Sequence, residues 1–223
     1  TIDGFIVAIA EETQSLKEYK HFKDIMNSGT PIVMFDRVAD GINCDKVVVD
    51  DFDSAYDATT HLIKLGSKKI ALLSTIHNLS VGKLRLDGYK KALSDANMSI
   101  DENLIIQETS IEDFDVQLQN LISSKKMDAI FALDEHSSTA SMKMALKQGI
   151  KIPEELNVIG FADGVWSRRL TPSLSTVSQH APEIGAKAAE LLIHKLNSKD
   201  EFYQPQTVVI KTELRQREST RKL

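Results

Sequence analysis

Residues 145–182 read ALKQGIKIPEELNVIGFADGVWSRRLTPSLSTVSQHAP and combine a helix end, a buried strand and a loop. Gly149 suits the position just after a helix, and Pro153 prevents that helix from continuing. The apolar run at 156–161 then predicts a buried strand. Such strands belong to parallel sheets with helices on both faces, where ligands bind in the loops at the carboxyl ends of the strands. The loop at 162–166 is therefore a candidate binding loop.

Strand and helix patterns alternate along the rest of the chain, which is typical of a doubly wound α/β fold. The predicted strands are 4–9, 31–35, 46–49, 69–74, 103–107, 128–133, 156–161 and 206–213. The predicted helices are 12–28, 53–65, 80–96, 112–124, 135–148 and 181–197.

Composition indicates a soluble protein of the cytoplasm. The 223 residues are 42% hydrophobic and 26% charged, so the chain is long enough to bury a core. No apolar run is long enough to cross a membrane, no signal-like segment opens the chain, and the single cysteine, Cys44, excludes an internal disulfide. A net charge of −5 argues against nucleic-acid binding by this chain alone, because such binding depends on Lys and Arg neutralising phosphates.

The sequence shows no motif of enzyme chemistry. Its six histidines have no short metal-ligand spacing, and Cys44 has no evident catalytic partner. No glycine-rich phosphate-binding motif follows a predicted strand. We therefore predict a protein that is not an enzyme, with no catalytic residue, metal site or cofactor.

Further motifs follow in a characteristic order. They are DGFIVAI (3–9), TPIVMFDR (30–37), VVVDDFDSAYDATTHLIKLGSKKIALLS (47–74), RLDGYKKAL (85–93), DAIFALDEHSSTASMKMAL (128–146) and VVIKTELRQREST (208–220). Together with residues 145–182, they resemble the effector-binding domain of the LacI/GalR family of bacterial transcription regulators. No single motif is specific, but their order and spacing are.

The resemblance implies a two-lobed, periplasmic-binding-protein-like fold with doubly wound parallel sheets. The amino-terminal lobe would comprise 1–66 plus 178–203, and the carboxy-terminal lobe 67–177 plus 204–223, with the effector between them. The family's helix-turn-helix headpiece precedes the motifs found here, as do two βα units of roughly 50 to 60 residues. The resemblance thus implies an incomplete amino-terminal lobe and an absent DNA-binding headpiece.

The implied function is effector sensing and dimerisation. A small, sugar-derived ligand would modulate operator binding by a homodimer through the missing headpieces. The alternative is a periplasmic sugar-binding protein of a transport system, which shares this fold. The segment TPSLSTVSQ and the tail ELRQREST favour the regulator.

Three charged residues are candidate effector contacts in the resembled family. Asp53 opens a predicted helix, so it either caps that helix or faces the effector. Arg85 matches a family arginine that binds ligand oxygens through its forked donors, and its alternative is a charge on a helix surface. Asp134 follows a predicted strand and precedes a helix, so it is an N-cap, a ligand contact, or both.

Three more candidates lie toward the carboxyl end. Gln179 could reach the ligand from a crossing segment or hydrogen-bond within it, and Trp166 could supply an aromatic face or a packing contact. Asp163 stands one place after the position at which many sugar-responsive members carry an aspartate, and Ala162 occupies that position. Leu133 likewise stands where those members carry asparagine. Both replacements remove hydrogen-bonding groups, which makes a free monosaccharide in the usual pose less certain.

Overall fold

The computed structural model describes residues 2–161, 163–198 and 203–222. The chain divides into two compact units. Unit 1 comprises Thr1–Asp50, Asn78–Ser80 and Gln179–Lys211, and unit 2 comprises Asp51–His77, Val81–Ser178 and Thr212–Leu223. Among the described residues, no helix is both long and apolar enough to cross a membrane.

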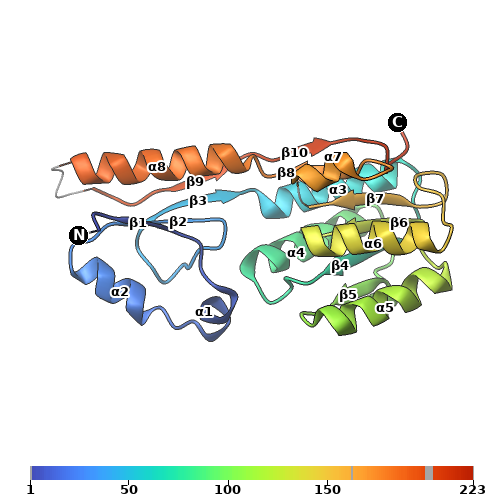
Figure 1. The fold of residues 1–223 in the computed structure, drawn as a ribbon, viewed down its shortest axis with the longest axis horizontal. Helices are drawn as coiled ribbons and strands as arrows, with labels where there is room; N and C mark the ends of the chain where they lie inside the picture. Colours follow the sequence, from blue (N-terminus) through green and yellow to red (C-terminus); the bar gives the residue numbers. More distant parts are fainter. Residues whose placement is uncertain (1, 162, 199–202, 223) are drawn as a thin grey trace. The chain divides into compact units, whose positions relative to one another are not determined.

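Unit 1 contains a four-stranded parallel sheet in the order β1-β2-β3-β9. Its elements are β1 (Phe5–Val7), α1 (Glu11–Leu16), α2 (Lys20–Asn27), β2 (Ile32–Phe35), β3 (Asp45–Val49), α8 (Ala181–Asn197) and β9 (Thr207–Ile210). Figure 1 shows α8 on one side of this sheet and α1 and α2 on the other.

Alternation along β2 explains the two faces of this sheet. Successive side chains of a strand point to opposite faces. Ile32 and Met34 accordingly join one apolar cluster with Phe22 of α2, while Val33 joins another with Ala188 of α8. The sheet of unit 1 is therefore packed on both faces.

Unit 2 contains a six-stranded sheet in the order β10-β8-β7-β6-β4-β5, parallel except for β10. Its strands are β4 (Ile70–Ser74), β5 (Ile105–Gln107), β6 (Ala129–Ala132), β7 (Asn157–Gly160), β8 (Ser175–Ser178) and β10 (Glu213–Arg215). Its helices are α3 (Asp51–Lys64), α4 (Ser80–Asp95), a 3₁₀ turn at Glu102–Leu104, α5 (Ile111–Ser124), α6 (Glu135–Lys147) and α7 (Val165–Arg169).

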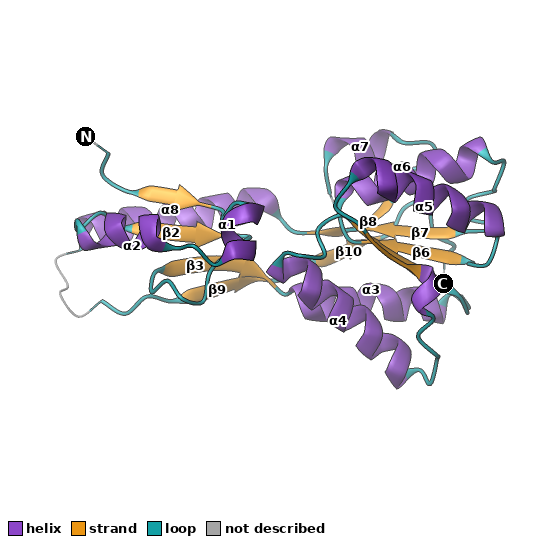
Figure 2. Ribbon diagram, turned by 90° about the horizontal axis from the view of Figure 1, so that it is seen from below, coloured by secondary structure: helices purple, strands orange, loops and turns teal. Residues whose placement is uncertain are grey.

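Helices cover both faces of the sheet in unit 2. Figure 2 shows α5 and α6 on one side and α3 and α4 on the other. Ile130 of β6 packs in the cluster with Phe114 of α5, and its neighbour Phe131 packs in the cluster with Leu62 of α3. The doubly wound α/β fold with parallel sheets is confirmed.

The division of the chain differs from the predicted lobes mainly at 51–66 and 204–211, and also at Asn78–Ser80 and Ser178. Helix α3 packs with unit 2, because Ala55, Ala58 and Leu62 join the cluster of Phe131, so unit 1 ends at Asp50 and not at 66. The predicted strand 206–213 is two strands: β9 pairs with β3 in unit 1, and β10 pairs with β8 in unit 2. The second segment of unit 1 consequently extends to Lys211 and not to 203.

Two local features differ from the elements that the sequence predicted. The predicted helix 12–28 is interrupted at Lys17, which ends α1 in a left-handed conformation with φ of 55°. A residue in this conformation closes a helix, although residues other than glycine and asparagine rarely adopt it. The short helix α7 was not predicted, because it lies within a segment with no helical periodicity.

Candidate functional site

The carboxyl edge of the sheet in unit 2 holds a buried arginine. Arg85 of α4 is 3% exposed, and its Nε donates a hydrogen bond to Oδ1 of Asp51 over 2.7 Å. Its Nη1 donates to the carbonyl oxygen of Leu133 over 2.7 Å, and its guanidinium lies 3.5 Å from the centre of the Phe161 ring. Leu133 directly follows β6 and Phe161 directly follows β7, so the guanidinium sits where these strands end.

Two glycines of α4 bring Arg85 to this edge. A Cβ on Gly82 would lie 2.1 Å from the carbonyl oxygen of Ile76, in the loop after β4. A Cβ on Gly88 would lie 2.3 Å from the carbonyl oxygen of Phe52, at the start of α3. Distances this short exclude any side chain, so only glycine lets α4 approach both backbones. Asp51 begins α3, and this close approach places it beside Arg85.

The pair of Arg85 and Asp51 is an ion pair removed from water, with both side chains at most 4% exposed. Removing one member of such a pair leaves an uncompensated buried charge. A guanidinium stacked on Phe161 also gains cation–π attraction. The burial of Arg85 excludes the alternative that it is a charge on a helix surface, and its predicted contact with an effector stays a prediction.

Asp134 is the N-cap of α6. Its Oδ1 accepts a hydrogen bond from the backbone N–H of Ser137 over 2.8 Å, which is the geometry of a capping side chain. Its Oδ2 accepts another from the backbone N–H of Thr75 over 2.8 Å. Asp134 therefore joins the loop after β4 to the end of β6, directly beside the carbonyl group that Arg85 binds.

Asp163 lies in the loop between β7 and α7 and is held by other protein groups. It accepts hydrogen bonds from Thr176 and Ser178 of β8 and forms ion pairs with Arg215 and Arg217. Burial by itself raises the pKa of this carboxyl group, but the hydrogen bonds from Ser178 and Arg217 and the two arginine charges outweigh burial, so the pKa is lowered.

The other three residues predicted to contact the effector are Asp53, Trp166 and Gln179. No contact described here joins them to the guanidinium of Arg85. Helix α3 begins at Asp51, two residues before the predicted start, so Asp53 is its third residue and not its N-cap. The side chain of Asp53 is exposed. Trp166 of α7 is 62% exposed. Gln179 is partly buried and is the first residue of the last segment of unit 1.

The sequence did not reveal three residues of this region. Asp51 was one of two adjacent acids at a strand end, and Phe161 was only the last residue of an apolar run. His77, in the loop after β4, has a buried Nδ1 with no hydrogen-bond partner among the described groups. A buried polar atom without a partner commonly marks a ligand or water position. Within the described ranges, no group of three or more His, Cys, Asp or Glu could hold a metal ion.

Comparison with known families identifies the class to which this architecture belongs. Residues 59–220 match the family described as periplasmic binding protein-like domain. The chain therefore belongs to this family, in the form found as the effector-binding domain of LacI-type regulators.

Two relatives of this chain are transcription regulators. The chain is 32% identical over 187 residues to the HTH-type transcriptional regulator DegA of Bacillus subtilis (strain 168), which covers 83% of this chain and 55% of that protein. It is 30% identical over 208 residues to the HTH-type transcriptional repressor PurR of Haemophilus influenzae, covering 91% of this chain and 60% of the repressor. These relatives favour a regulator over a transport protein.

The fold agrees with a solved structure of the same kind. The complex of the transcriptional regulator CelR with cellobiose superposes with a TM-score of 0.84 at 25% identity, covering 98% of this chain and 66% of that chain. The present chain thus spans about three fifths of the length of the relatives it matches.

Proposed function

We propose that this chain senses a small-molecule effector within a LacI-type transcription regulator, and that it is not an enzyme. The effector is received at the carboxyl edge of the sheet in unit 2, with Arg85 as its principal polar contact. The observation that supports this most strongly is the buried guanidinium beside the ends of β6 and β7, where open α/β sheets receive ligands.

Three contacts within the protein hold the guanidinium of Arg85 in a fixed orientation. Asp51 occupies its Nε, Leu133 occupies Nη1, and Phe161 fixes the plane of the guanidinium. A guanidinium has five N–H donors, and the hydrogen bonds to Asp51 and Leu133 use two of them. A donor held in a fixed plane loses little freedom when it binds an oxygen of a ligand, which favours affinity.

The class of effector follows from chemistry and from similarity. A sugar or sugar derivative is favoured, because the similar regulator CelR is solved with cellobiose. The apolar Leu133 removes one hydrogen-bonding side chain from the edge, while Ala162 lies outside the described residues. We therefore expect a ligand that makes fewer hydrogen bonds to this edge than a free monosaccharide would, such as a substituted or linked sugar. Asp53, Asp134 and Gln179 are further proposed contacts.

The whole regulator would have two macromolecular partners, operator DNA and a second copy of itself. Operator DNA would be bound by a helix-turn-helix segment of the whole regulator, in the cytoplasm, and not by this chain, whose net charge is −5. The regulator would act as a homodimer. The exposed apolar side chains Val165 and Trp166 of α7 support a contact of unit 2 with a second copy.

Calorimetry on the purified chain tests this function. A panel of cellobiose, ribose, phosphorylated sugars and, as a different chemical class, nucleobases should contain a ligand that binds saturably. Arg85→Lys keeps the charge facing Asp51 but loses the fork, so the affinity for that ligand should fall by roughly tenfold to a hundredfold. Lys83→Ala, an exposed neighbour on α4, is the control and should bind normally. Equal affinity in Arg85→Lys and the parent chain would remove Arg85 from the site.

A further inference from the structure

The carboxylate of Asp163 joins three segments of unit 2. Oδ1 accepts from Nη2 of Arg217 over 3.0 Å and from the hydroxyl of Thr176 over 3.3 Å. Oδ2 accepts from the hydroxyl of Ser178 over 2.8 Å and from Nη1 of Arg215. A carboxylate offers roughly four acceptor positions, so these four bonds leave no position for a ligand.

Two of the three segments are the strands at which the chain leaves and re-enters unit 2. Strand β8 ends at Ser178, and the next residue, Gln179, belongs to unit 1. The chain returns after Lys211, and β10 begins two residues later. These strands pair with each other in antiparallel register, with Glu213 opposite Ser178.

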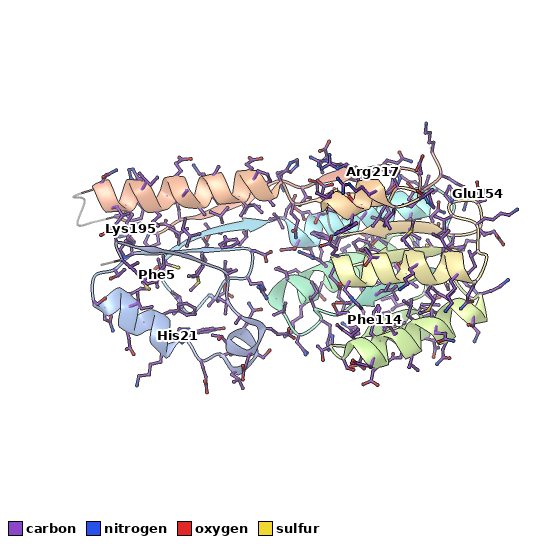
Figure 3. The ribbon with its side chains drawn as sticks, viewed as in Figure 1. Phe5, His21, Phe114, Glu154, Lys195 and Arg217 are labelled. Carbon is purple, nitrogen blue, oxygen red and sulfur yellow. The ribbon has the colours of Figure 1, made fainter. Side chains whose placement is uncertain are left out.

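Arg217, one of the two arginine partners of Asp163, also forms hydrogen bonds with other residues of unit 2. Nη1 of Arg217 also donates to the carbonyl oxygen of Leu174 over 2.7 Å and to the hydroxyl of Thr176 over 2.8 Å. Beyond Arg217, labelled in Figure 3, the hydroxyl of Ser219 donates to the carbonyl oxygen of Val158 in β7 over 2.6 Å. The tail is thus anchored to β7.

We propose that Asp163 is a positioning residue, and not an effector contact. It ties the loop after β7 to two of the chain connections between the units, the one after Ser178 and the one after Lys211. This inference rests on the proposed function, because that loop is the candidate binding loop. A displacement of the loop would move the carboxylate, and with it the ends of β8 and β10. Asp163 would in this way pass a change at the binding loop to both connections.

Limited proteolysis tests the proposal without any ligand. In Asp163→Asn, the side chain keeps its shape but loses the charge that pairs with two arginines. The variant loses the ion pairs of Asp163 with Arg215 and Arg217, which hold the segment that follows Lys211. Trypsin cleavage after Lys211 should therefore accelerate by roughly tenfold. Amide exchange should rise in β8 and β10 but not in β4 or β6. The control is Asp87→Asn, an exposed carboxylate of α4.

A second variant keeps the test decisive if Asp163→Asn folds poorly. Arg215→Gln leaves Asp163 and Arg217 in place and should show the same local pattern with a smaller amplitude. Unchanged cleavage and exchange in both variants would overturn the proposal, as would exchange that rises equally in β4, β6 and β8. Neither outcome affects the proposed effector function, which depends on ligand affinity and on Arg85.

Discussion

The two units of this chain bury their sheets to different degrees. In unit 2, every residue of β4, β6, β7 and β8 is buried. In unit 1, the inner strands β2 and β3 are only partly buried. The edge strands of the two sheets are alike, because β1 and β10 have no buried residue and β9 and β5 have one each. Ile6 of β1 and Ile193 of α8 are 40% and 57% exposed. The inner strands of unit 2 are thus more fully buried than those of unit 1, and Ile6 and Ile193 leave apolar surface on unit 1 that another element could cover.

The largest expected difference between the units is in core truncation. Phe131→Ala in unit 2 removes a side chain that is 0% exposed and should cost about 3 to 5 kcal/mol of unfolding free energy. Ile6→Ala in unit 1 removes a half-exposed side chain and should cost about 1 kcal/mol or less. Urea denaturation of both variants measures this contrast. Equal losses would show that the two sheets are equally important to stability.

The buried ion pair gives the next largest effect. Asp51→Ala leaves the guanidinium of Arg85 without its counter-charge and should cost about 3 kcal/mol. The matched change in unit 1 is Glu190→Ala, which breaks an exposed ion pair with Lys187. It should cost less than about 1 kcal/mol, as is typical for ion pairs at a protein surface. Thermal unfolding distinguishes the two. A small effect of Asp51→Ala would mean that water reaches the pair.

Self-association can show which unit carries the contact between copies. Trp166→Ser should weaken a dimer by roughly tenfold or more, because exposed tryptophans commonly anchor interfaces. Ile193→Ser in unit 1 should have the smaller effect. Light scattering over a concentration series measures both dissociation constants. A larger effect of Ile193→Ser would place the contact on unit 1.

The smallest effect is the pH dependence that arises from Asp163. Its pKa is lowered from the ordinary value of 3.8, so the folded state binds a proton less readily than the unfolded state. The stabilisation is therefore complete above pH 3.8 and is lost as the pH falls through the lower folded pKa. Asp163→Asn should flatten the acid limb of the stability curve below pH 4 and leave its shape near neutrality unchanged. An acid limb identical to that of the parent chain would contradict the lowered pKa.

The sequence predicted the strands well because parallel buried strands are continuous apolar runs. The run at 156–161 and the run at 128–133 contain β7 and β6 as the structure has them. The sequence could not assign α3 to unit 2, because an amphipathic helix shows which face is apolar but not which sheet that face meets. Membership of a unit is decided by packing between distant segments.

Among site residues, the sequence identified positions better than roles. Asp134 was expected between a strand and a helix and lies there as the N-cap of α6. Arg85 was expected as an effector contact, which stays a proposal, and its guanidinium lies beside the ends of β6 and β7. The partners of Asp163 were not foreseeable, because Arg215 and Arg217 are about 50 residues away in sequence and reach it only through the pairing of β10 with β8. Asp51 was missed because its adjacency to Arg85 depends on the close approach of α4 at Gly88.

Hydrogen exchange with and without a ligand found in the calorimetric panel tests the effector site most directly. Ligand should slow exchange in unit 2 at the loop after β4, around Thr75 to His77, and at the start of α6, around Glu135 to Ser137. Both segments are hydrogen-bonded to the carboxylate of Asp134, and the residue before it, Leu133, accepts a hydrogen bond from the guanidinium of Arg85. Exchange that is unchanged in both segments, while the ligand binds, would contradict a site at this edge of the sheet.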